Sequence, residues 1–286
     1  MNSFINLMYH NVTPNGVSYP DLSPSVTGYF VDQCTFESHL QVIRQRGHCI
    51  GSTDVSAFFD QPMTDDVSDV MSAMQISFDD GWAGSYDVAG PILETHGFSG
   101  ILFVTTDLVG RRHCVTRADL SRMNRNVMTI GSHAKTHRFL NRLKSDEIRE
   151  ELSYSKGYLE DAVGYEVDSL SIPGGALDGR VRQIAEEVGY RFLYTSEIHR
   201  NTFRRGAMNI GRIAIKNGTA LADIGRYVRG DIRKEQFRRR VLSIPKLILG
   251  QHRYHALRRR VLGEEEEQNE MVDLKTQGSN TNDQCS

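Results

Sequence analysis

The chain has 286 residues and carries 34 Lys or Arg against 36 Asp or Glu, which gives a formal net charge of −2 at pH 7. Its length is sufficient for one barrel-sized domain with a full hydrophobic core. The balanced charge gives no global case for nucleic-acid binding. No run of about 18 apolar residues occurs, so no transmembrane helix is predicted.

Alternating apolar and turn-rich segments predict alternating strands and helices. The strands are expected at residues 4–8, 75–79, 101–104, 170–172, 192–194 and 210–215. Two helices are expected at 36–46 and at 86–96, the second ended by Gly97. A third helix is expected to begin at a Ser145 cap, with Ile148, Leu152, Leu159 and Val163 on one face. A fourth contains Val181, Ile184, Ala185 and Val188 and ends at Gly189. Repeated strand and helix units imply parallel strands in an α/β fold.

Two connecting segments interrupt this alternation. Residues 11–29 are rich in proline and glycine and directly follow the strand end at His10. Such a segment either lines a groove or is a plain surface connection. Residues 61–69 are polar and acidic, and we expect an exposed connection there.

The C-terminal region differs from the rest in charge. Between residues 232 and 263 there are ten Lys or Arg against one Glu, with apolar residues interspersed. Such a segment either lies on an anionic membrane surface or packs on the domain with a solvated basic face. We therefore divide the chain into a main domain (1–230), a basic helical appendage (231–263) and a disordered acidic and polar tail (264–286).

The most informative feature is a pair of carboxylates, Asp79 and Asp80, combined with a histidine pair further along the chain. Gly81 allows a sharp turn directly after the carboxylates. His133 and His137 are four residues apart, the spacing that places two side chains on one face of a helical turn. One carboxylate and two imidazoles are ligands of catalytic zinc and also of non-haem iron(II).

The second carboxylate favours hydrolysis, because metal-activated water needs a base beside it. Each pair alone has a simpler interpretation. Asp-Asp-Gly is typical of a turn, and two histidines are commonly surface residues. Their joint occurrence at the ends of apolar segments favours a catalytic metal site.

These motifs resemble those of the polysaccharide deacetylase family, which shares the NodB homology domain. Residues 77–81 resemble its first motif, Thr/Ser-Phe-Asp-Asp-Gly, and residues 133–137 its second, His-Ser/Thr-x-x-His. Further matches in the family's order are the Met-Tyr-His opening strand of one branch at Leu7–His10, the first helix at Phe36–Gly47, a strand at Gly97–Val104 and the third motif at Ile172–Gly175. The likeness covers roughly residues 4–215.

The resemblance implies an irregular (β/α)7 barrel related to the TIM barrel. It implies one divalent metal ion, Zn²⁺ with Ni²⁺, Co²⁺ and Fe²⁺ as alternatives. The ligands that it implies are Asp80, His133 and His137. Asp79 corresponds to the general base, and a backbone N–H after Pro173, that of Gly174, to the oxyanion donor.

The chain departs from the family's pattern at two positions. Ser171 stands where the third motif often has an arginine, and strand 210–215 has no histidine for a general acid. We expect both to be features of the branch. His10 then becomes the candidate for the acid or for a substrate contact, unless it is a structural residue, and Arg212 becomes a charge near the site.

The resemblance therefore implies an enzyme that deacetylates an amino sugar in a polysaccharide or in a lipid- or nucleotide-linked precursor, as in exopolysaccharide biosynthesis. The alternative is a weak or inactive glycan-binding scaffold in an assembly complex. The four cysteines are scattered and have no framework spacing, and residues 1–8 lack the features of a signal peptide. We therefore expect a cytoplasmic protein, with residues 232–262 as a peripheral contact to the inner face of the membrane.

Overall fold

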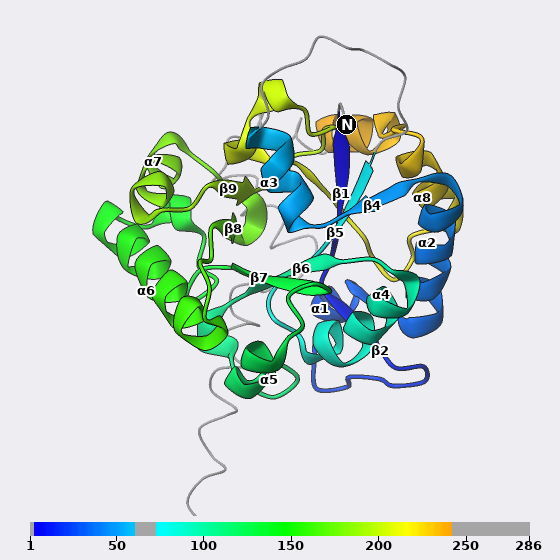
Figure 1. The fold of residues 1–286 in the computed structure, drawn as a ribbon, viewed down its shortest axis with the longest axis horizontal. Helices are drawn as coiled ribbons and strands as arrows, with labels where there is room; N and C mark the ends of the chain where they lie inside the picture. The colour runs from blue at the N-terminus through cyan, green and yellow to red at the C-terminus, as the bar shows by residue number, and fades with distance from the viewer. Residues whose placement is uncertain (1–2, 61–72, 242–286) are drawn as a thin grey trace, which may run out of the picture.

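The computed structural model describes residues 3–60 and 73–241, and its centre is a curled parallel sheet (Figure 1). The strands of this sheet are β1 (Phe4–Tyr9), β4 (His48–Ile50), β5 (Ala73–Phe78), β6 (Gly100–Val104), β7 (Met128–Ser132), β8 (Ser169–Ser171), β9 (Phe192–Tyr194) and β10 (Arg212–Ala214). Seven of them follow the order β10-β1-β5-β6-β7-β8-β9, and β4 pairs with the first residues of β5. A parallel bridge between Tyr194 and Ile210 brings the two sheet edges together. The prediction of an irregular (β/α)7 barrel is confirmed.

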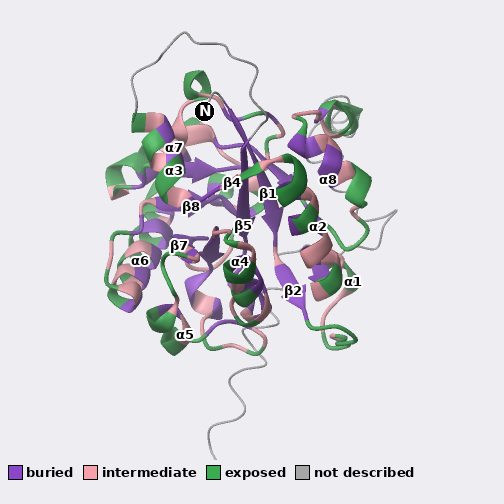
Figure 2. Cartoon of the chain, turned by 45° about the vertical axis from the view of Figure 1, so that its right-hand side comes forward, coloured by how far each residue is buried: buried purple, intermediate pink, exposed green. Residues whose placement is uncertain are grey.

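Helices cover the outside of this barrel (Figure 1). They are α1 (Pro24–Thr27), α2 (Gln33–Arg46), α3 (Ser52–Asp60), α4 (Gly90–His96), α5 (Arg117–Arg122), α6 (Ser145–Val163), α7 (Gly179–Val188) and α8 (Leu221–Val228). The apolar faces of the surrounding helices pack on the outward side of the strands, and Figure 2 shows the buried strands inside a shell of exposed helix surface. Two helices are exceptions. Ser25 and Val26 of α1 line a cavity at the carboxyl ends of the strands. Helix α3 closes the barrel end where β1 begins, and its Phe58 packs edge-on against Phe4 with ring centroids 5.6 Å apart.

The inward side chains change from apolar to polar along the barrel axis. Near α3 the interior is apolar and contains Phe4. One step further, Asn6 donates to the side-chain oxygen of Gln75 (2.9 Å), and Gln75 donates to the hydroxyl of Tyr194 (3.0 Å). The hydroxyl of Ser77 donates to Asn6 (2.8 Å). Because strand side chains alternate, the next inward position after Ser77 is Asp79, at the open end of the barrel.

The observed elements agree with most predicted ones, with corrections at the ends. Residue 144, not Ser145, is the N-cap of α6. The helix expected at 86–96 begins as a π-helical turn, Ser85–Ala89, and it ends at Gly97 in the left-handed conformation as predicted. The sequence patterns did not predict α3, α5, α8, β4 or β7, each of which has nine residues or fewer.

The connecting segment 11–29 contains a second, two-stranded sheet of β2 (Asn11–Thr13) and β3 (Phe30–Asp32) with helix α1 beside it. The segment 61–69 and the tail 264–286 lie outside the described residues. Residues 233–241 are helical. They contact the barrel domain, where Gln236 donates to the carbonyl of Ile198 in the segment after β9 (3.2 Å). In the part of the chain that the structure describes, every helix is too short or too polar to span a bilayer.

Candidate active site

A cavity of about 180 Å³ opens at the carboxyl ends of the barrel strands. Seven of the eight predicted site residues line it: His10, Asp79, Asp80, His133, His137, Gly174 and Arg212. The eighth, Pro173, is buried next to Gly174 and does not reach the cavity. The structure therefore brings together residues that lie up to 202 positions apart in the chain, from His10 to Arg212.

The acidic pair is presented by a tight turn after β5. Asp80 and Gly81 both have positive φ angles, 75° and 91°, which are ordinary for glycine and uncommon for aspartate. After this turn, the Asp79 side chain contacts Arg212 and Ser171, and the Asp80 side chain faces the histidines. The indole N–H of the fully buried Trp82 donates to Oδ2 of Asp80 (3.0 Å). This hydrogen bond fixes the carboxylate so that Oδ1 faces the imidazoles.

The histidine pair meets in a different way from the predicted helical turn. The segment from His133 to His137 is irregular, and both Ala134 (φ 60°) and His137 (φ 62°) are left-handed. The expectation of a shared helical face is wrong, although the two side chains do converge. The residue that holds this loop is Glu151 of α6, which is 1% exposed.

Glu151 accepts hydrogen bonds from four groups of the loop. Its carboxylate receives the backbone N–H groups of Lys135 (3.0 Å) and Thr136 (2.8 Å). It also accepts the hydroxyl of Thr136 (2.5 Å) and the guanidinium of Arg138 (3.0 Å). A buried carboxylate satisfied by this many donors fixes the backbone on both sides of Thr136, and hence the position of His137.

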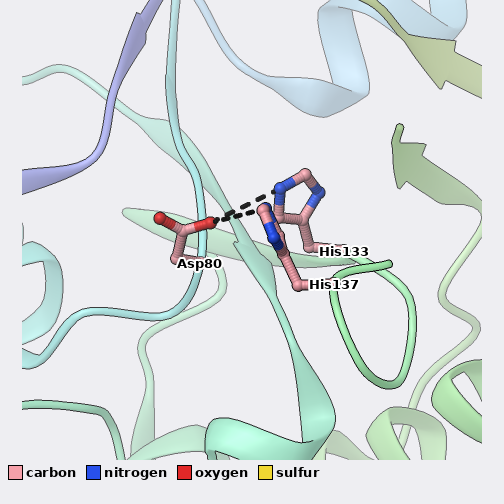
Figure 3. A group of neighbouring side chains, drawn as sticks. All are labelled: Asp80, His133 and His137. Carbon is pink, nitrogen blue, oxygen red and sulfur yellow. Dashed lines mark ion pairs between the residues drawn. The ribbon is translucent and has the colours of Figure 1, made fainter. Parts of the chain in front are cut away.

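The three candidate ligands form one compact group (Figure 3). Oδ1 of Asp80 lies 3.5 Å from Nε2 of His133 and 3.5 Å from Nε2 of His137. Two atoms bound at about 2.1 Å to a tetrahedral zinc ion lie about 3.4 Å apart. The spacing and the chemistry of the donors therefore fit one divalent ion.

The tautomer of His133 also suits a metal ligand. Nδ1 of His133 lies 2.8 Å from the carbonyl oxygen of Ser171, which can only accept, so Nδ1 carries the proton. Nε2 is left with a lone pair directed at Asp80. Burial lowers the pKa of His133 to about 3, although the nearby Asp79 opposes this shift. The ring is therefore neutral at physiological pH.

Asp79 lies beside this group and is held by Arg212. The guanidinium donates to both carboxylate oxygens, at 2.7 Å to Oδ1 and 2.8 Å to Oδ2. The hydroxyl of Ser171 donates to Oδ2 of Asp79 (3.1 Å) and accepts from Arg212 (2.8 Å). Arg212 thus takes the place of the arginine that the third motif lacks, and the serine at that motif position completes the contact.

This contact determines the ionisation of Asp79. Burial alone raises the pKa of the carboxyl group, but the charge of Arg212, with a smaller contribution from His133, outweighs it. The pKa is held well below its ordinary value, so Asp79 is ionised at neutral pH. Oδ2 of Asp79 lies 3.9 Å from Nε2 of His133, next to the candidate metal position.

His10 forms the opposite wall together with residues of the segment 11–29. Its ring packs on Tyr29 with centroids 4.5 Å apart, and the ammonium of Lys216 lies 4.2 Å from the centre of the Tyr29 ring. Among the described residues, Nδ1 of His10 has no hydrogen-bond partner. Burial lowers the pKa of His10, although Asp80 and Asp79 oppose the shift.

Of the two interpretations of segment 11–29, its final part supports groove lining. Ser25, Val26 and Tyr29 reach the cavity wall. Gly174 lies across the cavity with φ 63°, and a Cβ atom there would come within 2.0 Å of the Phe139 ring. Glycine is therefore required at this position.

Sequence reasoning missed three contributors to the site: Trp82, Glu151 and the hydroxyl of Ser171. Trp82 follows the acidic turn directly, and a tryptophan beside a candidate ligand was a usable signal. Glu151 had no such signal in the sequence, because it is one of several acidic residues in a surface helix. Only its burial in the structure distinguishes it.

The fold and the site together define an α/β-barrel hydrolase. The sequence profile of the polysaccharide deacetylase family matches residues 69–193. The match covers 125 of the 286 residues. Together with the similar proteins described next, it supports a hydrolase of this family, which acts on carbon–nitrogen bonds of non-peptide amides.

Known proteins resemble the chain over most of its length. The putative polysaccharide deacetylase YxkH of Bacillus subtilis is 23% identical over 222 residues, which are 78% of this chain and 75% of that protein. The Streptococcus pyogenes deacetylase PplD, solved with acetate, has a TM-score of 0.67 at 21% identity and covers 78% of this chain and 96% of its own. A de-N-acetylase from Aggregatibacter actinomycetemcomitans has a TM-score of 0.67 at 15% identity, and the match covers 79% of this chain and 100% of that one. These structures share the fold.

Proposed function

We propose that this protein uses one divalent metal ion to remove the N-acetyl group from an amino sugar. The sugar belongs to a polysaccharide or to a lipid- or nucleotide-linked glycan precursor. The observation that carries the proposal is the convergence of Asp80, His133 and His137 beside an Asp79 that Arg212 keeps ionised. The names of the similar proteins, a polysaccharide deacetylase and a de-N-acetylase, agree with this chemistry.

Asp80, His133 and His137 are the residues that would hold the metal ion. When bound, such an ion polarises the acetamide carbonyl and lowers the pKa of a coordinated water. We propose Zn²⁺, because one carboxylate and two neutral imidazoles suit it. Ni²⁺, Co²⁺ and Fe²⁺ accept the same donors and are the alternatives to test.

Asp79 is the proposed base. Its carboxylate accepts a proton from the attacking water, whose oxygen becomes part of the released acetate as the carbon–nitrogen bond breaks. Arg212 and Ser171 hold the carboxylate in place during this transfer. The backbone N–H of Gly174, on the cavity wall, is the proposed donor to the developing oxyanion.

The leaving amine needs the proton that the water has lost. Because Arg212 keeps the pKa of Asp79 low, a protonated Asp79 is a strong acid and returns the proton readily. The lowered pKa of His10 makes its ring neutral in the resting site. We therefore assign His10 to a substrate contact through Nδ1 rather than to a resting acid.

Acetate release tests this proposal. Wild type and Asp79→Asn are incubated with N-acetylhexosamine oligomers and with nucleotide- and lipid-linked N-acetyl sugars, after chelation and after addition of Zn²⁺, Ni²⁺, Co²⁺ or Fe²⁺. We expect acetate release that requires a metal ion and falls by about 10³-fold in Asp79→Asn. Arg122→Gln, on the outer surface, serves as the control and retains full activity. Glycan binding without any metal- and Asp79-dependent acetate release would instead identify a scaffold.

A further inference from the structure

Arginines gather at the end of the barrel that lies opposite the candidate active site. A second cavity, of about 540 Å³, is lined by Arg200, Arg205, Arg229 and Arg233. The neighbouring Asn201 pairs with Phe4, the first residue of β1, whereas His10 follows the last residue of that strand. The six residues of β1 span about 20 Å, so the two cavities open at different ends of the barrel.

The lining of this cavity is strongly basic. Its four arginines face one carboxylate, Asp231, which Arg233 binds at 3.0 Å. Arg200 donates to the hydroxyl of Ser3 (2.9 Å), a neutral partner, and forms no ion pair with the residues that the structure describes. An adjoining cavity of about 330 Å³ shares Arg205 and adds Arg239 and Arg240 against one carboxylate, Glu197. This concentration of positive charge contrasts with the chain as a whole, whose formal net charge is −2.

Exposed apolar side chains accompany the arginines. In the helical segment 233–241, one face is turned to the barrel through Gln236, and the buried Ile232 directly precedes the segment. On the other face, Phe237 is 69% exposed and Val241 44% exposed. Phe203, in the turn that leads to Arg205, is 37% exposed. These side chains contribute little to packing on the barrel.

We infer that this surface, defined by Arg200, Arg205, Arg229, Arg233 and Phe237, attaches the protein to an anionic phospholipid membrane. Guanidinium groups bind phosphate oxygens through paired hydrogen bonds. Phenylalanine and valine side chains gain free energy when they enter the interface between head groups and acyl chains. A nucleic-acid backbone would match the charge but would leave these apolar side chains in water.

The sequence that follows agrees with this occupant. Beyond the described helix, residues 242–263 continue the combination of basic and apolar residues. Anionic lipids give the cytoplasmic leaflet its negative surface potential, which attracts such segments. Attachment through the strand-start end of the barrel leaves the mouth of the proposed active site open to glycan. The inference concerns a separate surface and does not depend on the proposed deacetylation.

Vesicle co-sedimentation of the full chain tests the inference. We expect wild type to bind vesicles of phosphatidylcholine with one quarter phosphatidylglycerol, and not vesicles of phosphatidylcholine alone. High salt releases the bound protein, because screening weakens each contact. Arg200→Glu/Arg205→Glu/Arg229→Glu lowers binding by about 100-fold or more, since each lysine or arginine near the surface contributes to attraction.

The matched control is Arg117→Glu/Arg122→Glu/Arg125→Glu, which makes the same change of charge around α5 and retains binding. Phe237→Ser removes one exposed side chain without disturbing the core, and we expect several-fold weaker binding. Circular dichroism tests whether each variant is folded. If the Arg200 triple variant is not folded, the binding of Phe237→Ser to anionic vesicles tests the inference. The inference is overturned if wild type does not bind anionic vesicles or if both triple variants lose binding equally. It is also overturned if the Arg200 triple variant and Phe237→Ser bind as wild type does, or if the protein binds duplex DNA more tightly than vesicles.

Discussion

The two ends of the barrel use arginine in opposite ways. At the active-site end, the side chain of Arg212 is 1% exposed and donates to both oxygens of one carboxylate. At the other end, the side chain of Arg233 is 87% exposed and Arg229 is exposed as well. A buried arginine must be paired, and it therefore fixes geometry. An exposed arginine costs little and contributes mainly to the electric field around the molecule.

The largest expected difference between the ends is in stability. Arg212→Gln leaves the buried Asp79 without its cation, and we expect the free energy of unfolding to fall by about 3–5 kcal/mol. Arg229→Gln, at the exposed end, changes it by less than about 0.5 kcal/mol. Urea unfolding of the two variants measures both values. Equal losses would show that the arginines do not differ in the way described.

A smaller effect is expected for the carboxylate that holds the histidine loop. Glu151→Gln keeps the shape of the side chain but loses the charge that accepts the Lys135 and Thr136 N–H groups. We expect affinity for Zn²⁺ to fall by about 10–100-fold, the usual effect of losing an outer-shell partner. Titration of the metal-free protein against a chromophoric chelator gives this affinity without any assay of turnover.

The neighbouring Glu150 is the matched control for this prediction. It lies on the same helix and pairs with the side chain of Lys135, but it is largely exposed. Glu150→Gln should bind Zn²⁺ as wild type does, because the backbone of the loop keeps its acceptor. If both variants bind the metal equally well, Glu151 does not position His137.

The smallest expected effect is on the pH dependence of stability. His39 is fully buried, its Nδ1 contacts the hydroxyl of Tyr9 (3.1 Å), and burial lowers its pKa. The unfolded chain takes up a proton below a pH of about 6.5 while folded His39 stays neutral, so stability falls as the pH is lowered. The loss proceeds from that pH down to the lowered pKa of the folded state.

His39→Gln removes this proton uptake. We expect unfolding free energies measured between pH 7.5 and 5.5 to fall less steeply in the variant, by at most about 1.4 kcal/mol per pH unit. Arg229→Gln at the exposed end leaves the slope unchanged. A slope that is the same in wild type and His39→Gln would contradict the assignment of a neutral buried ring.

The sequence patterns predicted parallel strands and the meeting of Asp79, Asp80, His133 and His137, and the family resemblance extended this prediction to the barrel. The ends of parallel strands gather at one rim, so residues that follow apolar segments are brought together. The conformation of the histidine loop was not predictable, because left-handed angles at Ala134 and His137 depend on a distant acceptor rather than on local spacing.

Arg212 illustrates the limit more sharply. A charged residue in an apolar strand indicates a buried role, and the position was predicted as a charge near the site. Its partner could not be predicted, because the pairing depends on how closely the sheet curls toward closure. The buried role of Glu151 was likewise not predictable, because the acidic residues near it in α6, Glu147 and Glu150, are largely accessible to water.

The pairing of Arg212 with Asp79 links residues that are 133 positions apart, from β5 to the last strand of the barrel. A chain that has been synthesised only through β9 already contains Asp79, Asp80, His133 and His137, but it lacks the cation that keeps Asp79 ionised. Completion of the base and closure of the barrel are therefore the same event. The arrangement proposed for hydrolysis is therefore complete only when β10 lies beside β1.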